Sequence, residues 1–357
     1  MSRSTHLVGA WPGFSAAHAM DVAFTRLGPW LDRLSDGETG LRSQWVTPIV
    51  EGMRANPDVE MTQDGDYSHY DKTPKYKVRE GRTLDPANID LGFRRAFEGS
   101  YPAFKELRRR HGYDHVRFQV GVPSPIDLAV VVFGGPAAFA DPSLVEAFLR
   151  AEIMEIGAIT ALADPEDVVF QIESIVAIPA AGAGETSGDV HAMTGESNQM
   201  LGRISGLFAA LAHGAPENTH FGIHLCLGDF NHEAFSRLEN VEPIVRVANA
   251  IVERWPDGRP LDYIHVPFAA ASEPPPTDPQ FYASLAQLRL PEHVRLVAGF
   301  VHEHVDEAGH RALLATIERA AGREVDVAAT CGLGRRPDNA QAYETMDMSR
   351  LLLQTTA

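Results

Sequence analysis

Val168-Val169-Phe170-Gln171-Ile172-Glu173-Ser174 is an apolar run, and a second such run, Phe221–Gly228, follows it after a helical pattern at Met193–Ala212. Short runs rich in Val, Ile and Phe are typical of strands that are buried on both faces. A helix-length segment between two of them is typical of a βαβ unit. The two runs are therefore expected to be parallel strands of one sheet.

The same alternation continues in both directions along the 357-residue chain. Apolar runs lie at His6–Trp11, Leu31–Thr39, Val116–Ser124, Val168–Ser174, Phe221–Gly228, Leu261–Phe268, Arg295–His304 and Val325–Leu333. Helices are expected at Ala16–Leu31, Leu91–His111, Pro142–Leu162, Met193–Ala212, Val241–Trp255, Pro279–Leu288, Glu307–Ala320 and Asn339–Leu353. Eight strands favour a closed barrel over an open sheet, and no phosphate-binding glycine fingerprint follows the first strand. We therefore predict a single α/β domain over residues 1–357, a (β/α)8 TIM barrel.

Gly52–Pro86 interrupts the alternation after the second strand. The segment is polar and rich in Asp, Tyr, Lys and Pro, and an insertion at this point of a barrel lies on the C-terminal rim. Because long insertions in compact domains are often functional, we interpret residues 52–86 as a lid, with a decorative loop as the alternative. A second segment, Pro179–Gly195, is rich in Gly, Ala and Thr and is expected to be a mobile rim loop.

The composition limits the classes of partner. The formal net charge is −17, which disfavours nucleic acid because phosphate binding needs a basic stripe. No apolar run is long enough to span a membrane, and the N-terminus lacks the apolar stretch of a signal peptide. Two cysteines do not make a disulfide scaffold. The expected location is therefore the cytoplasm, with small-molecule partners, and a homodimer is compatible with these features.

Both cysteines of the chain lie at predicted strand ends, where barrel enzymes carry their chemistry. Side chains alternate along a strand, so His224 and Cys226 point to the same side, toward the mouth of the barrel. Cys331 occupies the equivalent height on the eighth strand. Imidazole and two thiolates with one open position are typical of a catalytic zinc site. Two unconnected buried cysteines, or a disulfide, are the alternatives.

In their order along the chain these elements resemble the C-terminal catalytic barrel of cobalamin-independent methionine synthases, within the superfamily that includes uroporphyrinogen decarboxylase. The resemblance covers nearly the whole chain thinly and is strongest in its second half. Matching motifs are His224-Leu225-Cys226, Asp229-Phe230-Asn231, Cys331-Gly332-Leu333 and Gly9-Ala10-Trp11-Pro12, the last corresponding to the family's Gly-Ser-Phe-Pro.

The resemblance implies a zinc ion that binds a substrate thiol and activates it to attack an alkyl group, with His224, Cys226 and Cys331 as ligands. The family's fourth ligand is a Glu, and Pro267 stands at that position. His265, two residues earlier on the same strand face, is the candidate replacement. Water or substrate filling the fourth place is the alternative.

The resemblance also assigns roles to other strand ends. Gln171-Ile172-Glu173 is similar to the family's Gln-Ile-Asp strand, whose carboxylate holds the substrate amino group, so Glu173 is expected to contact substrate. His304 stands at the place of the family's acid/base histidine. Gly9 and Trp11 belong to the expected amino-acid pocket.

Three more rim residues are candidates for substrate binding. Asp36 and Glu38 point the same way from the second strand and could bind a cation or cap a turn. Arg335 could clamp a substrate carboxylate or form a surface salt bridge. The predicted function is a zinc-dependent methyl or alkyl transferase acting on a thiol. Its alternatives are a lyase or decarboxylase on the same barrel, with the metal as Lewis acid or absent, and a binding protein without activity.

Overall fold

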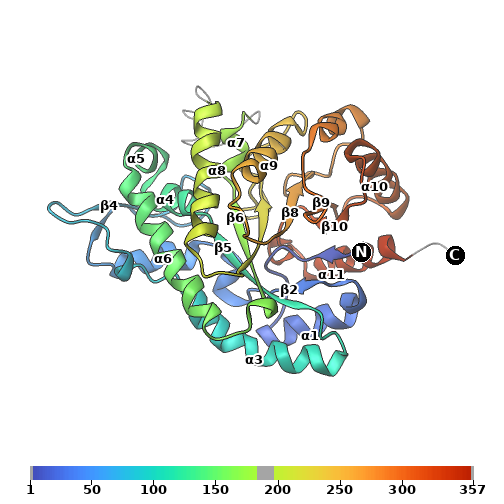
Figure 1. Ribbon diagram of the computed structural model, residues 1–357, viewed down its shortest axis with the longest axis horizontal. Helices are drawn as coiled ribbons and strands as arrows, with labels where there is room; N and C mark the ends of the chain where they lie inside the picture. Colours follow the sequence, from blue (N-terminus) through green and yellow to red (C-terminus); the bar gives the residue numbers. More distant parts are fainter. Residues whose placement is uncertain (1–2, 183–196, 355–357) are drawn as a thin grey trace.

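Parallel strands surround a central axis in the computed structural model, which describes residues 3–182 and 197–354 (Figure 1). Eight strands form one sheet in the order β1-β10-β9-β8-β7-β6-β5-β2, and a parallel bridge between Thr5 and Leu31 joins its two edges. The nearly closed sheet with its flanking helices confirms the predicted (β/α)8 barrel. The strands are β1 (Thr5–His6), β2 (Arg33–Leu34), β5 (Arg117–Pro123), β6 (Val168–Ser174), β7 (His220–Leu225), β8 (Leu261–Pro267), β9 (Arg295–Val301) and β10 (Asp326–Ala329).

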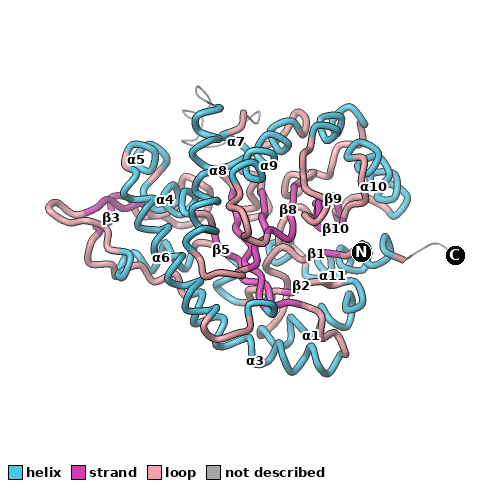
Figure 2. Tube along the Cα trace, in the orientation of Figure 1, coloured by secondary structure: helices cyan, strands magenta, loops and turns pink. Residues whose placement is uncertain are grey.

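Helices alternate with these strands and cover the outside of the sheet (Figure 2). Five of the α-helices begin at a Ser or Asp whose side chain accepts a hydrogen bond from a free backbone N–H of the first turn, namely at Ser15, Ser124, Asp141, Asp306 and Asp338. The α-helices are α1 (Ala16–Leu27), α2 (Thr47–Gly52), α3 (Phe93–His111), α4 (Pro125–Phe133), α5 (Gly135–Ala140), α6 (Pro142–Thr160), α7 (Ala177–Ala180), α8 (Ser197–Gly214), α9 (Glu242–Arg254), α10 (Glu307–Ala321) and α11 (Asn339–Leu353).

The predicted helices formed with two differences. The segment expected at Pro279–Leu288 is a 3-10 helix, η7 (Pro279–Gln287). The first residues of the helix expected at Met193–Ala212 lie outside the described residues, as does most of the rim loop expected at Pro179–Gly195. Shorter 3-10 turns are η1 (Gly28–Trp30), η2 (Gly40–Gln44), η3 (Met53–Ala55), η4 (Pro86–Asn88), η5 (Pro165–Asp167) and η8 (Leu333–Arg335).

The first two strands are shorter than their apolar runs predict. β2 ends at Leu34 because Gly37, with φ of +78°, and Glu38, with φ of +43°, turn the backbone out of the extended conformation. The loops after β1 and β2 are nevertheless held together, since Trp11 N donates to Gly37 O at 3.2 Å. This pairing keeps both loops at the rim.

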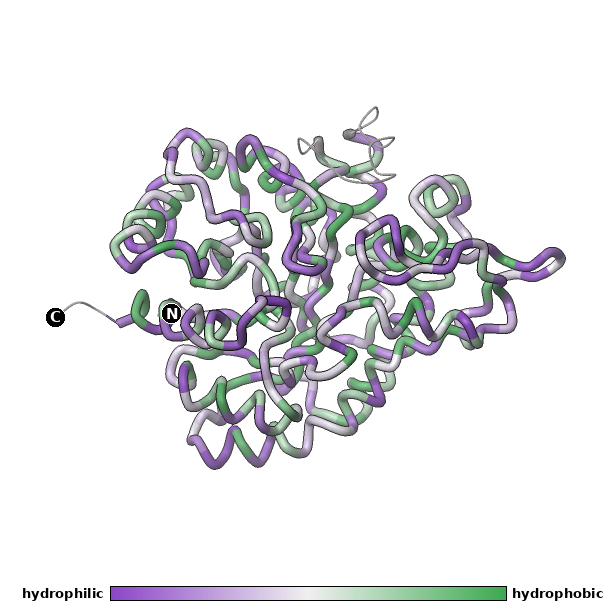
Figure 3. Tube along the Cα trace, turned by 180° about the vertical axis from the view of Figure 1, so that it is seen from behind, coloured by the Kyte–Doolittle hydropathy of each residue, from purple (hydrophilic) through white to green (hydrophobic). Residues whose placement is uncertain are grey.

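The insertion at 52–86 contains an antiparallel hairpin of β3 (Val59–Gln63) and β4 (Lys75–Val78), which extends sideways from the barrel (Figures 1 and 2). Hydrophobic and hydrophilic residues alternate along the helices around the barrel (Figure 3), as expected when one face of each helix packs on the sheet. In the described ranges, no helix has the length and apolar character needed to cross a membrane.

The barrel interior combines an apolar layer with polar side chains. Val169, Val297 and Ala328 pack around Tyr263 in the interior. Gly222 leaves room for that ring, because a Cβ at this position would lie 2.1 Å from Tyr263 Cε1. Beyond this layer, at the mouth of the barrel, the C-terminal ends of the strands carry the candidate site residues.

Candidate metal centre

Three predicted ligands converge at the mouth of the barrel. His224 is on β7, Cys226 directly follows that strand, and Cys331 follows β10. One ligand atom from each side chain lies within 4.8 Å of the others, and all three residues are buried. The two sulfur atoms are 3.6 Å apart.

Cys331 lies beyond the regular part of β10, where strand alternation does not fix the direction of a side chain. Ala328 pairs with Gly299, but Ala329 pairs with Val301, so one residue of β9 is skipped between them. Ala328 faces the barrel interior with Tyr263, and strict alternation would have placed residue 330 on that side. The extra residue belongs to β9, and β10 ends at Ala329, so Cys331 reaches the ligand cluster from the loop two residues beyond the strand.

The tautomer of His224 follows from its neighbour His265. His265 Nε2 lies 3.0 Å from Ala329 O, an acceptor, so this nitrogen carries the proton and Nδ1 is bare. His224 Nδ1 lies 2.8 Å from that bare nitrogen and must donate to it. The lone pair of His224 is therefore on Nε2, and its pKa is lowered well below the usual value by burial and by His265. A neutral imidazole of fixed tautomer is the form that binds metals.

The thiols are close enough to share a proton. Cys226 donates a hydrogen bond to Cys331 Sγ, which raises the pKa of Cys226 and lowers that of Cys331. Two sulfurs at about 2.3 Å from a tetrahedral zinc ion lie about 3.8 Å apart. The observed separation of 3.6 Å and the donor set of one imidazole and two thiols both fit zinc.

Two carboxylates face the same space from neighbouring parts of the rim. A Cβ at Gly121 on β5 would lie 2.8 Å from Glu173 Oε1 and 2.9 Å from Glu38 Oε1, so both carboxylates flank this glycine. Burial raises the pKa of Glu38 to about 7, and burial together with the charge of Glu38 raises the pKa of Glu173 well above its usual value. Two buried carboxylates this close together resist ionisation unless a positive charge lies beside them. A cationic ligand group at this place would therefore be bound favourably.

A cavity of about 820 Å³ connects these groups. Its lining includes the three metal-ligand candidates, Glu38, Glu173, Gly9 and Arg335, together with residues of α4 and α5 and the loop between β3 and β4. From that loop Tyr70 reaches the segment after β7: its hydroxyl accepts from Phe230 N at 3.1 Å and donates to Glu233 O at 3.0 Å.

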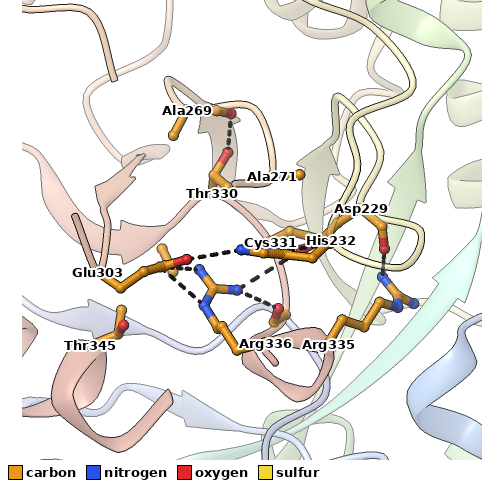
Figure 4. Close-up of polar contacts among 12 residues, drawn as sticks. Asp229, His232, Ala269, Ala271, Glu303, Thr330, Cys331, Arg335, Arg336 and Thr345 are labelled. Carbon is orange, nitrogen blue, oxygen red and sulfur yellow. Dashed lines mark hydrogen bonds and ion pairs between the residues drawn. The ribbon is translucent and has the colours of Figure 1, made fainter. Parts of the chain in front are cut away.

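A buried ionic cluster lies beside Cys331 and joins the loops after β7, β9 and β10 (Figure 4). His232 Nε2 is 3.0 Å from Glu303 Oε1, and its Nδ1 is 3.6 Å from Asp229 Oδ1. Arg336 contacts Glu303 at 3.3 Å and donates to Gly332 O at 3.0 Å. The neighbouring Arg335 extends to the other side and donates to Asp229 O at 2.8 Å.

Several predicted site residues lie elsewhere. Trp11 is buried behind the rim, where its indole N–H donates to Ala19 O at 2.9 Å. Asp36 pairs with Arg42 at 2.5 Å and accepts from Glu38 N at 3.0 Å, so it supports the loop that carries Glu38. His304 is exposed, and His265 stands behind His224; none of these four predicted residues is among the described lining of the cavity.

Tyr70 and Trp45 are among the cavity residues that were not predicted from the sequence. Tyr70 lies within the insertion that was interpreted as a lid, but nothing marked this tyrosine among its neighbours. Trp45 lines the cavity with a backbone φ of +55°, which is rare for a bulky side chain. No sequence pattern indicates such a conformation.

Fold and cluster together define a (β/α)8-barrel protein with a His/Cys/Cys group that could hold a metal ion. No family model and no curated protein match the chain. Among solved structures, a B12-independent methionine synthase from Shewanella sp. W3-18-1 in complex with selenomethionine is similar, with a TM-score of 0.56 over 99% of this chain and 94% of that chain, at 11% identity. At this identity the similarity shows the barrel fold alone.

Proposed function

We propose that this protein is a zinc-dependent transferase that moves a methyl or other alkyl group to a small-molecule thiol. The observation that carries the proposal is the convergence of His224, Cys226 and Cys331, three buried ligands from two distant strand ends, in a cavity large enough for substrates. His265 is not included as a ligand, because both of its ring nitrogens are hydrogen-bonded.

Zinc held by His224, Cys226 and Cys331 would lower the pKa of a substrate thiol at the remaining coordination position and so supply a thiolate nucleophile. In the proposed transfer a bond forms between the substrate sulfur and the alkyl carbon. The bond between that carbon and the donor's leaving atom breaks, and its electron pair stays with the leaving atom. The thiol proton is released.

The substrate thiol is proposed to carry a cationic group. Glu38 and Glu173 lie in the same cavity as the sulfur ligands, and within the described ranges neither carboxylate forms an ion pair. An ammonium group there would form charge-assisted hydrogen bonds, which are the stronger kind. The carboxylates would hold the substrate in one orientation, with its sulfur toward Cys226 and Cys331.

The cavity volume of about 820 Å³ supports a reaction of two substrates. Ligand pockets usually measure about 300–1,000 Å³, and an amino thiol occupies only a small part of such a space. The part lined by α4, α5 and the β3–β4 loop would then accept the alkyl donor.

Metal content measured by elemental analysis tests the proposal. We expect close to one zinc per chain in the wild type and loss of zinc in Cys226→Ser and His224→Gln. The matched control is His220→Gln, because His220 is on the same strand at its other end, where it pairs with Asp262. This control should retain zinc.

Thiol binding and transfer are tested on metal-loaded protein. Replacing zinc with cobalt should give a thiolate-to-cobalt absorption band that increases when 2-aminoethanethiol is added. Mass spectrometry should detect the S-methyl product with an N-methyl folate or a trimethylsulfonium salt as donor. A protein without stoichiometric metal, or with metal but no thiol-dependent band, would contradict the proposal.

A further inference from the structure

Arg33 is a buried cation in the barrel interior. It is 5% exposed, its Nη2 atom has no hydrogen-bond partner, and the described residues provide it with no ion pair. Its guanidinium carbon lies 3.8 Å above the centre of the Tyr263 ring, and its Nε donates to His6 Nδ1 at 3.0 Å. Burying an unpaired charge lowers the stability of the folded protein. A buried arginine without an ion pair is therefore expected to have a function that offsets this loss.

A chain of hydrogen bonds leads from Arg33 toward the cavity, and its direction is fixed by chemistry. Arginine has no acceptor, so His6 Nδ1 must accept from it and His6 Nε2 must carry the ring proton. His6 Nε2 then donates to Gln171 Oε1 at 2.8 Å. Gln171 Nε2 in turn donates to Glu173 Oε1 at 2.7 Å. Each donor in the series points from the cation to the carboxylate.

The Gln171 amide cannot be reversed. Its Nε2 also contacts Val8 O at 2.6 Å, and its Oε1 also accepts from the Tyr263 hydroxyl at 3.0 Å. Reversal would place the amide oxygen against two other acceptors, the Val8 carbonyl and the Glu173 carboxylate, and the amide nitrogen against the N–H of His6. The series therefore has one stable polarity.

We propose that Arg33 and His6 are positioning residues for substrate binding, and that they act through Gln171 on the Glu173 carboxylate. We call this series of hydrogen bonds from Arg33 through His6 and Gln171 the relay. It holds one oxygen of Glu173 from the barrel interior and leaves the rest of the carboxylate facing the cavity. It thereby selects thiols that carry a primary ammonium group. This inference rests on the proposed function, because the ammonium is the substrate group that Glu173 is proposed to hold.

A purely structural role for these residues makes a different prediction. If the relay only satisfied buried polar groups, breaking it would lower stability and would affect all thiols alike. If it positions Glu173, breaking it would weaken the binding of a cationic thiol and leave a neutral thiol unaffected. The ratio of the two affinities therefore separates the two roles.

The matched variants are His6→Leu and His6→Gln. Leucine breaks the relay, whereas a glutamine amide can accept from Arg33 through its oxygen and donate to Gln171 through its nitrogen. Cobalt-loaded proteins would be titrated with 2-aminoethanethiol and with 2-mercaptoethanol, and the thiolate-to-cobalt band gives both dissociation constants. We expect His6→Leu to lose about tenfold in preference for the amino thiol, the scale of one hydrogen bond to a charged group. His6→Gln should keep most of that preference.

An unchanged preference in folded, cobalt-loaded His6→Leu would overturn the inference, as would an equal loss for both thiols. If His6→Leu does not fold, Arg33→Met replaces it, since this variant removes the donor to His6 together with the charge, and the same loss is expected. Failure of the proposed function is distinguishable: the wild type itself would then lack the cobalt band or any preference for the amino thiol, and the inference would fall with it.

Discussion

Gly121 is the residue on which the carboxylate pair depends most directly. A methyl group at this position would come within 2.8 Å of Glu173 Oε1 and 2.9 Å of Glu38 Oε1, closer than Cβ atoms approach oxygen in folded proteins. Glu173 is held from the opposite direction by Gln171 at 2.7 Å, so its carboxylate has little freedom to move away.

We therefore predict that Gly121→Ala displaces both carboxylates and weakens the binding of 2-aminoethanethiol about tenfold, while zinc content is unchanged. Overpacking should also lower the free energy of unfolding by about 1–3 kcal/mol. Calorimetric titration and denaturant unfolding measure the two effects. Gly99→Ala is the control, because beyond the neighbouring turns of its own helix no heavy atom lies within 4 Å of a Cβ there. Wild-type affinity in Gly121→Ala would show that these carboxylates do not hold the substrate.

Single residues of the site were predictable only where strand periodicity applies. His224 and Cys226 share a face because their spacing is two, and the same rule relates Gln171 to Glu173. Cys331 reaches the cluster from the loop two residues after the end of β10, where strand periodicity no longer applies. Trp11 and His304 were assigned to the site by motif position, yet one is turned toward Ala19 and the other is exposed.

At the scale of elements, the loop between β3 and β4 is attached to the barrel mouth through Tyr70. In addition to the two hydrogen bonds of its hydroxyl group, Tyr70 packs against two aromatic rings. The centre of its ring lies 5.3 Å from the ring centre of Phe230 and 5.1 Å from that of Phe235. The sequence predicted an insertion and its place on the rim, but it could not predict the hairpin, because the strands of an isolated hairpin pair through contacts that composition does not encode.

If this loop covers the cavity as a lid, Tyr70→Ala should uncover it. We predict that Cys226 and Cys331 of the zinc-free variant react several times faster with a disulfide reagent, while the thermal unfolding of the barrel changes little. The control is Tyr67→Ala, since Tyr67 lies in the same loop but bonds to Glu51 at 2.6 Å. Equal reactivity of wild type and Tyr70→Ala would argue against the lid.

For the whole molecule, alternation of apolar runs and helical patterns was sufficient to predict the barrel. Each of the eight runs overlaps an observed strand, although β1 and β2 are two residues long. Fold prediction succeeded because it depends on a repeated pattern with many members, so a weak second strand did not change the outcome. The site depends on a few side chains and on local departures from regular structure, where no repetition supports the prediction.

The ionic cluster around His232 couples stability of the whole molecule to pH. The Asp229 and Glu303 carboxylates on either side of the ring raise the pKa of His232 to about 9. A histidine whose pKa is higher in the folded than in the unfolded chain, where it is about 6.5, binds its proton more tightly in the folded state. Its contribution is fully present below about pH 6.5 and is lost as the pH rises toward 9.

We therefore predict that the wild type is more stable than His232→Gln at pH 6, by on the order of 2 kcal/mol, and that the difference has largely disappeared at pH 10. Denaturant unfolding of both proteins across this range measures it, and the difference between them cancels titrations that they share, such as those of the two thiols. Because His232 links the loops after β7 and β9, the loss should appear as reduced stability of the entire barrel and not as fraying of one loop. A difference that stays constant from pH 6 to 10 would mean that His232 is not protonated between its two carboxylates, and that the cluster holds these loops through neutral contacts alone.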